Sequence, residues 1–279
     1  MQGCSPSSPA GPRLWRPAAQ RSLRNSWSSI SLHLSAWSAA SSHGFSAASS
    51  LINSLLSIRY LQFMDFGVLK AMADIQSKAS DKLLYQGEAS FMEMLTSYKS
   101  LVESLSLMRK AGGTMKTYLK GPVTGNLIEF SDQQHLDKDA GDGDGLPVFS
   151  TLSVYTHEML AQELLDMFIA EIKIKWLVIS ELHRLLYLGV DVHHPKRVDS
   201  KKLMDNVHTE AAVKLPWLLD TRLEHDSVVS TQQGPGYSVK REVFQVYLTA
   251  WLTEVNVRKS RKDEILKLIS EDMQFSIQG

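Results

Sequence analysis

The densest group of titratable side chains in this 279-residue chain lies between residues 193 and 210. Neutral imidazoles and carboxylates can bind zinc or iron, and four members of the group are candidate ligands: His193, His194, Asp205 and His208. Their spacing fits no established site, because the chain contains neither Glu-x-x-His nor His-Glu-x-x-His. We expect a structural or solvated role for these residues, with metal binding as the alternative.

Three further ionisable residues fall on the apolar half of a helix that the sequence predicts over Thr156–Leu188. Glu171 and Lys175 form an i, i+4 pair with the acidic residue first, which is the favourable order. We expect this pair to reach water where two packing partners of the helix separate; burial beside a cavity would instead suggest a functional role. His183 is expected to be a neutral core histidine rather than a catalyst.

No residue is assigned a catalytic or cofactor-binding role. The chain lacks a phosphate-binding P-loop, a G-x-S-x-G nucleophile elbow and the protein-kinase motifs. Its only cysteine is Cys4, so the rest of the chain has no thiol for disulfides, thiolate metal sites or nucleophilic catalysis. We expect no cofactor, and a non-enzymatic role is favoured over an enzymatic one.

The helix predicted over Thr156–Leu188 is the element around which the chain is organised. Its apolar residues recur at helical spacing in two adjacent stripes, which predicts an interior helix contacted from two directions. Charged residues recur every few positions, so it is not a membrane span. The two stripes are Leu165, Phe168, Ile172, Trp176, Ile179, Leu182 and Leu186, and Leu160, Leu164, Met167, Ile174, Val178 and Leu185.

Other helices should pack on this one. Apolar spacing predicts a long helix from Leu84 to Gly112, another from Leu203 to Leu215, and a C-terminal pair around Phe244–Val255 and Ile265–Met273. Short β-favouring runs within 116–131 predict a small hairpin, and the Asp/Gly-rich run at about 131–147 predicts a flexible loop. The expected fold is mainly α, a bundle of about five or six helices with a β-hairpin insertion.

Residues 1–64 have a different composition from the remainder. They are rich in Ser, Ala and Arg and contain no Asp or Glu, which is typical of an organellar transit peptide. A disordered extension is the alternative. We expect residues 65–279 to form a single, mostly helical domain that begins after this segment.

The abundance of Ser favours the chloroplast, whereas a possible amphipathic helix at residues 51–60 would suit the mitochondrion. Translation from Met64 or Met72 would leave the protein in the cytoplasm.

Charge and composition restrict the partners. Five of the 30 Lys and Arg residues precede Asp65, so the body carries 25 basic against 30 acidic residues and is a poor match for nucleic acid. We expect a soluble organellar protein that contacts protein partners as a scaffold, assembly factor or complex subunit, in an undetermined oligomeric state. The alternative is a helical metal- or small-molecule-binding enzyme that uses the cluster at residues 193–210.

Overall fold

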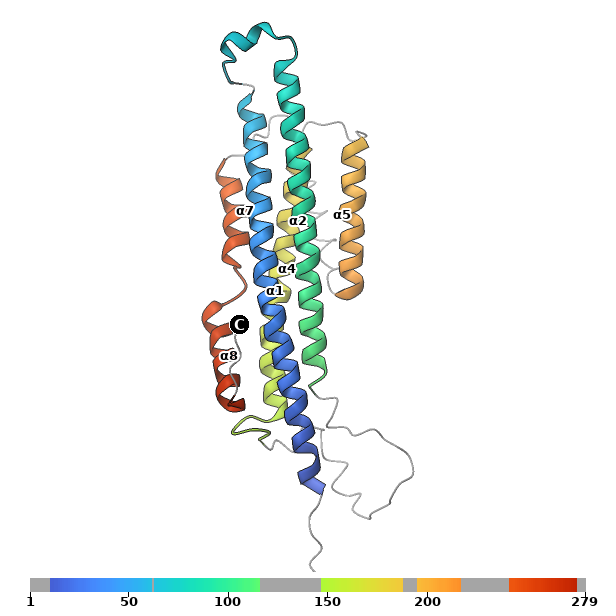
Figure 1. Ribbon diagram of the computed structural model, residues 1–279, viewed down its shortest axis with the longest axis vertical. Helices are drawn as coiled ribbons and strands as arrows, with labels where there is room; N and C mark the ends of the chain where they lie inside the picture. The colour runs from blue at the N-terminus through green and yellow to red at the C-terminus, as the bar shows by residue number, and fades with distance from the viewer. Residues whose placement is uncertain (1–10, 62, 116–146, 188–194, 217–240, 275–279) are drawn as a thin grey trace, which may run out of the picture. The chain divides into compact units, whose positions relative to one another are not determined.

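The computed structural model describes residues 11–61, 63–115, 147–187, 195–216 and 241–274, and every regular element among them is helical (Figure 1). The prediction of a mainly α fold is confirmed. The predicted hairpin and nearly all of the Asp/Gly-rich loop lie outside the described residues. The elements are α1 (Gly11–Leu61), the 3-10 helix η1 (Gly67–Ala71), α2 (Ile75–Gly113), α4 (Val154–Leu186), α5 (Pro195–Lys214), α7 (Arg241–Thr253) and α8 (Lys259–Met273).

The chain divides into two compact units, each assembled from separate stretches of sequence. Unit 1 comprises residues 1–35, 107–167 and 258–279, and unit 2 comprises residues 36–106 and 168–257. The division does not follow the predicted boundary at residue 64. Helices α1, α2 and α4 each contribute one part of their length to either unit.

Unit 1 is a four-helix arrangement in which the first part of α1 and the last turns of α2 meet the first part of α4 and α8. Its core is apolar and is supplied by all four segments, together with Val148 from the stretch that precedes α4. The buried residues include Leu23, Trp27, Ile30, Met108, Ala111, Leu164, Leu165, Ile265 and Ile269. This burial is the main source of stability for such a unit.

Helix α4 is the central element of unit 2, as the sequence predicts. It contacts α1 through Phe168 and Trp37, whose ring centroids lie 4.9 Å apart. Trp176 packs on Tyr98 of α2 at 5.3 Å and on His208 of α5 at 4.4 Å. Nearly all residues of the two predicted apolar stripes are buried, with Ile174 only half-buried. The predicted interior helix is therefore confirmed.

The transit peptide predicted within residues 1–64 stays a prediction. In that segment residues 11–61 form one continuous helix, α1, and not the disordered extension that was the alternative. Leu23, Trp27, Ile30, Leu34 and Trp37 follow one another at spacings of four and three, and all five are buried. The same spacing continues through small residues at positions 41, 44 and 48. Because Ser, Gly and Ala interrupt the apolar stripe, its helical period is weak in the sequence.

None of the helices in the described part of the chain has the length and apolar character needed to cross a lipid bilayer.

Candidate functional site

Glu171 and Lys175 are buried in unit 2 within a cluster of charged and polar groups. The ammonium Nζ of Lys175 lies 3.7 Å from Oε1 of Glu171 and 3.8 Å from Oε1 of Glu254. It donates hydrogen bonds to the Ser41 hydroxyl at 3.1 Å and to the Trp251 carbonyl oxygen at 3.0 Å. The cluster therefore connects α1, α4 and the end of α7.

The carboxylates of this cluster have additional donors. Oε2 of Glu171 accepts hydrogen bonds from the backbone N–H of Asn256 at 3.0 Å and from its side-chain amide at 3.4 Å. Oε1 of Glu254 accepts the indole N–H of Trp37 at 2.8 Å. Glu254 holds a left-handed backbone conformation, with φ of 49°, directly after α7. The contacts to Trp37 and Lys175 offset the cost of that conformation for a residue other than glycine.

The expectation that Glu171 and Lys175 reach water is wrong: both side chains are 0% exposed. Burial lowers the pKa of Lys175, and the nearby Glu254 and Glu171 oppose that change. Burial likewise raises the pKa of Glu171, against the opposing effects of the Asn256 N–H and Lys175. Neither group can meet a substrate in this conformation, so the geometry supports a role in fixing helix register rather than in catalysis.

His183 is also buried, at 7% exposure, and takes part in an aromatic contact. Its Nε2 lies 3.0 Å from the Ser200 hydroxyl of α5, and its ring centroid lies 5.1 Å from that of Phe91 in α2. These contacts join three helices of unit 2. They agree with the interpretation of His183 as a core histidine.

Only two of the four candidate metal ligands, Asp205 and His208, lie in the part of the chain that the structure describes. His193 and His194 lie outside the described residues. Asp205 is half-buried, whereas His208 is buried against the indole ring of Trp176. Among the residues that the structure describes, no three His, Cys, Asp or Glu side chains are grouped so that they could hold a metal ion.

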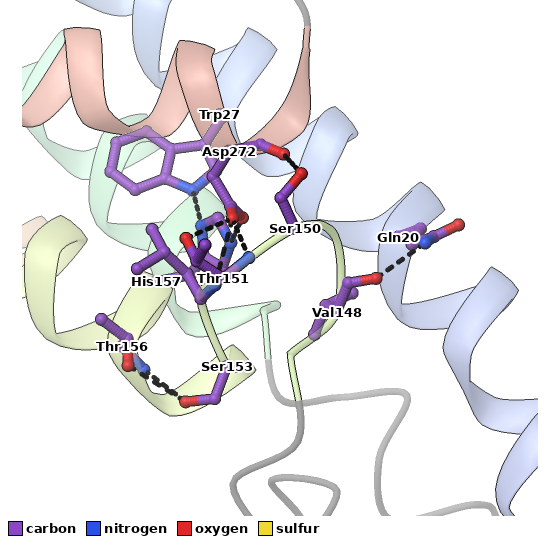
Figure 2. A network of polar contacts seen from close by, with 10 residues as sticks. Gln20, Trp27, Val148, Ser150, Thr151, Ser153, Thr156, His157 and Asp272 are labelled. Atoms are coloured by element: carbon purple, nitrogen blue, oxygen red, sulfur yellow. Dashed lines mark hydrogen bonds and ion pairs between the residues drawn. The ribbon is translucent and has the colours of Figure 1, made fainter.

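A second buried polar network lies in unit 1, and the sequence did not single it out (Figure 2). The indole N–H of Trp27 in α1 donates to Nδ1 of His157 in α4 at 3.1 Å. The other ring nitrogen, Nε2, lies 3.2 Å from Oδ2 of Asp272 in α8. Oδ1 of the same carboxylate accepts the backbone N–H groups of Thr151 and Leu152, at 2.6 and 3.0 Å.

The network determines the protonation of His157. An indole N–H is a donor only, so Nδ1 must carry its lone pair toward Trp27 and the proton must sit on Nε2, facing Asp272. Burial lowers the pKa of His157, although Asp272 opposes this. Burial acts to raise the pKa of Asp272, but hydrogen bonds from Thr151 and Leu152 outweigh it, and the net shift is downward. The ring is fully buried, so Trp27 occupies the position that a substrate or nucleophile would need.

The connection between α1 and α2 shows the opposite feature, apolar side chains that are exposed. Helix η1 has no buried residue. Phe63 is 84% exposed and Val68 is 91% exposed. We call residues 60–72 the apolar tip; its other exposed large apolar side chains are Tyr60, Met64, Leu69 and Met72.

One sequence signal could have revealed the unit 1 network. Ile265, Ile269 and Asp272 stand at positions i, i+4 and i+7 of one helix, so the carboxylate of Asp272 falls on its apolar face. Nothing in the spacing around His157 or Trp27 marks them as its partners. No protein-family model, curated protein or solved structure matches the chain. The chemistry of its own side chains therefore carries the functional argument.

Proposed function

We propose that this protein acts through protein–protein contacts, as a scaffold, assembly factor or complex subunit, and that the apolar tip is its contact surface. The observation that carries the proposal is the exposure of six large apolar side chains within residues 60–72. Scattered exposed apolar residues are ordinary, but a contiguous group commonly marks an interaction site.

Polar contacts order the backbone of the apolar tip without burying it. The carboxylate of Asp65 accepts the backbone N–H of Gly67 at 3.2 Å and pairs with the Lys70 ammonium at 2.9 Å. Gly67 has φ of +51°, a conformation that glycine adopts without steric cost. The turn thus keeps its shape while Phe63 and Val68 face solvent, which lowers the ordering cost of binding.

The charges of the tip favour a protein partner. Asp65 and Lys70 neutralise one another, so the tip offers no surplus of positive charge to a phosphate backbone or an anionic lipid surface. A neutral, apolar groove on another protein is the complementary surface. Aromatic and methionine side chains such as Phe63, Met64 and Met72 are the types enriched at such interfaces.

The test compares two triple variants of the full chain as baits in quantitative affinity purification. Phe63→Ser with Val68→Ser and Leu69→Ser removes apolar side chains from the tip. Val213→Ser with Val246→Ser and Leu252→Ser removes equally exposed ones from α5 and α7. We expect the first variant to lose a defined set of partners that the wild type and the second variant retain.

All three proteins should melt within a few degrees of one another, because the altered side chains are exposed and such changes usually cost about 0.5 kcal/mol or less. Equal partner recovery by both variants would refute the assignment of the tip. A wild-type protein that recovers no partner would refute the function itself.

The location of the protein is a further proposal. The composition of residues 1–64 supports an organelle, the chloroplast first and the mitochondrion second. Ala19 is the first buried residue among those whose burial the structure describes, so an import signal that is removed should end before this part of α1. A fluorescent reporter fused to residues 1–64 tests this, and a diffuse cytosolic signal would exclude import.

A further inference from the structure

The Trp27–His157 contact can exist in only one protonation state. Protonation of the imidazole places a second N–H on Nδ1, 3.1 Å from the indole nitrogen, which is itself a donor. Two donors then face one another, and the hydrogen bond is lost. The proton on Nε2 still faces Asp272, so the link from α4 to α8 survives while the link from α4 to α1 does not.

Among the described residues, few charged groups near His157 could offset this loss. Asp272 of α8 is the carboxylate in contact with the ring. Arg24 of α1 lies nearby, with its guanidinium over Phe149, whose ring contacts His157. Glu158 follows His157 on α4 and is half-buried, and Arg109 and Lys110 near the end of α2 are exposed. The stretch that precedes α4 brings no charged residue to the site between positions 147 and 153.

We propose that Trp27, His157 and Asp272 form a pH-sensitive latch, which strengthens the attachment of α1 to α4 in unit 1 while His157 is neutral and weakens it when His157 is protonated. The latch closes over the apolar stripe of α1 that contains Leu23, Trp27 and Ile30, all buried. Loss of the hydrogen bond weakens the attachment of that stripe to α4. This inference is independent of the apolar tip, which belongs to unit 2.

The direction of the pH effect follows from proton binding. An unfolded chain takes up a proton at His157 near the ordinary pKa of about 6.5. Burial lowers the pKa of His157 in the folded chain, so the unfolded state binds the proton first as the pH falls. The contribution of the latch is therefore complete above about pH 6.5 and declines as the pH drops from there toward the folded pKa.

Nuclear magnetic resonance of the full-length protein, with labelled histidine, tests the latch directly. At pH 7.5 we expect His157 to carry its proton on Nε2. Trp27→Phe removes the opposing donor and should raise the pKa of His157 by roughly half to one unit, the range expected for one neutral hydrogen bond. Trp37→Phe is the matched control, because that indole donates to Glu254 in unit 2 and should leave His157 unchanged.

A second variant separates the latch from the other histidines. His157→Gln offers an oxygen to Trp27 and an N–H to Asp272 but cannot be protonated. When the pH is lowered from 7.5 to 5.5, the denaturant concentration at the unfolding midpoint should fall further for the wild type than for His157→Gln. A proton on Nδ1 at pH 7.5, an unchanged His157 pKa in Trp27→Phe, or equal pH dependence in His157→Gln and wild type would each overturn the proposal.

Discussion

Lys175 shows at residue scale how this fold accommodates a buried charge. Its Nζ has two hydrogen-bond acceptors and lies near two carboxylates, and it also lies 4.5 Å from the centroid of the Trp251 ring. A buried ion pair often contributes little relative to an apolar pair of the same size, yet removing one partner leaves the other charge uncompensated. The cluster should therefore act mainly as a determinant of helix register.

Lys175→Met should lower the free energy of unfolding by about 3–5 kcal/mol, the usual cost of breaking a buried ion pair. The reason is that Glu171 and Glu254 then face one another without a cation. Chemical denaturation at neutral pH measures the loss.

The matched comparison adds Glu171→Gln and Glu254→Gln to Lys175→Met, which removes all three charges. Most of the lost stability should return in this triple variant. If the single substitution costs no more than the same change at the exposed Lys201 of α5, Lys201→Met, the cluster does not have the assigned role.

The sequence predicts which residues of this cluster are unusual, but it does not predict whether they are buried. Glu171, Lys175 and His183 stand out because the side of a helix on which a residue lies follows from the sequence of that helix alone. Whether the side chains of Glu171 and Lys175 are exposed to water depends on α7 and on residues 254–256, which are distant in sequence. The sequence does not mark His157 for the same reason, since its partners Trp27 and Asp272 are contributed by other helices.

At the scale of elements, the small residues of α1 explain the position of α7. The indole N–H of Trp251 donates to the carbonyl oxygen of Ser41 at 3.0 Å, and its ring lies against Gly44. Ser97 of α2 also donates to the carbonyl oxygen of Ala40 in α1. Helices α1, α2 and α7 thus approach one another closely where α1 carries small residues. The same small residues made the stretch resemble a transit peptide in composition.

Gly44→Ala should destabilise the protein by about 1–3 kcal/mol, the usual range for overpacking a core. An added Cβ would lie 2.5 Å from Cζ2 of Trp251 and 2.7 Å from the Ser97 hydroxyl oxygen. The indole is fully buried and hydrogen-bonded, so it cannot move aside cheaply. Thermal or chemical unfolding measures the change.

Gly113→Ala is the matched control, because a Cβ there meets no atom within 4 Å. That substitution should be neutral or slightly stabilising, since alanine favours the helix by up to about 1 kcal/mol. Equal stability of the two variants would mean that α1, α2 and α7 do not approach as closely as described.

At the scale of the whole molecule, neither unit is a continuous piece of sequence. Unit 1 takes Leu23 and Trp27 from α1, and unit 2 takes Trp37 and Leu51 from the same helix. Burial of a large apolar side chain contributes roughly 1.5–3 kcal/mol. Four such residues are therefore comparable to the 5–15 kcal/mol that separates a typical folded domain from its unfolded state.

Deletion of residues 1–64 should leave a chain without fixed tertiary structure. We expect residues 65–279 to keep far-ultraviolet helical dichroism, to lose near-ultraviolet dichroism and to bind hydrophobic dyes. Addition of a separate peptide of residues 1–64 should restore the native spectra. A truncated protein that unfolds as cooperatively as the full chain would show that α1 is dispensable, as a cleaved transit peptide would be.

The network that connects Trp27 to Asp272 of α8 through His157 also has a consequence during translation. About 245 residues separate Asp272 from Trp27. At roughly 5–20 residues per second, their synthesis takes on the order of ten seconds or longer. Throughout that interval the apolar stripe of α1 lacks its final partners from unit 1. We expect the nascent chain to be a client of ribosome-associated chaperones, with α1 as the segment that they protect.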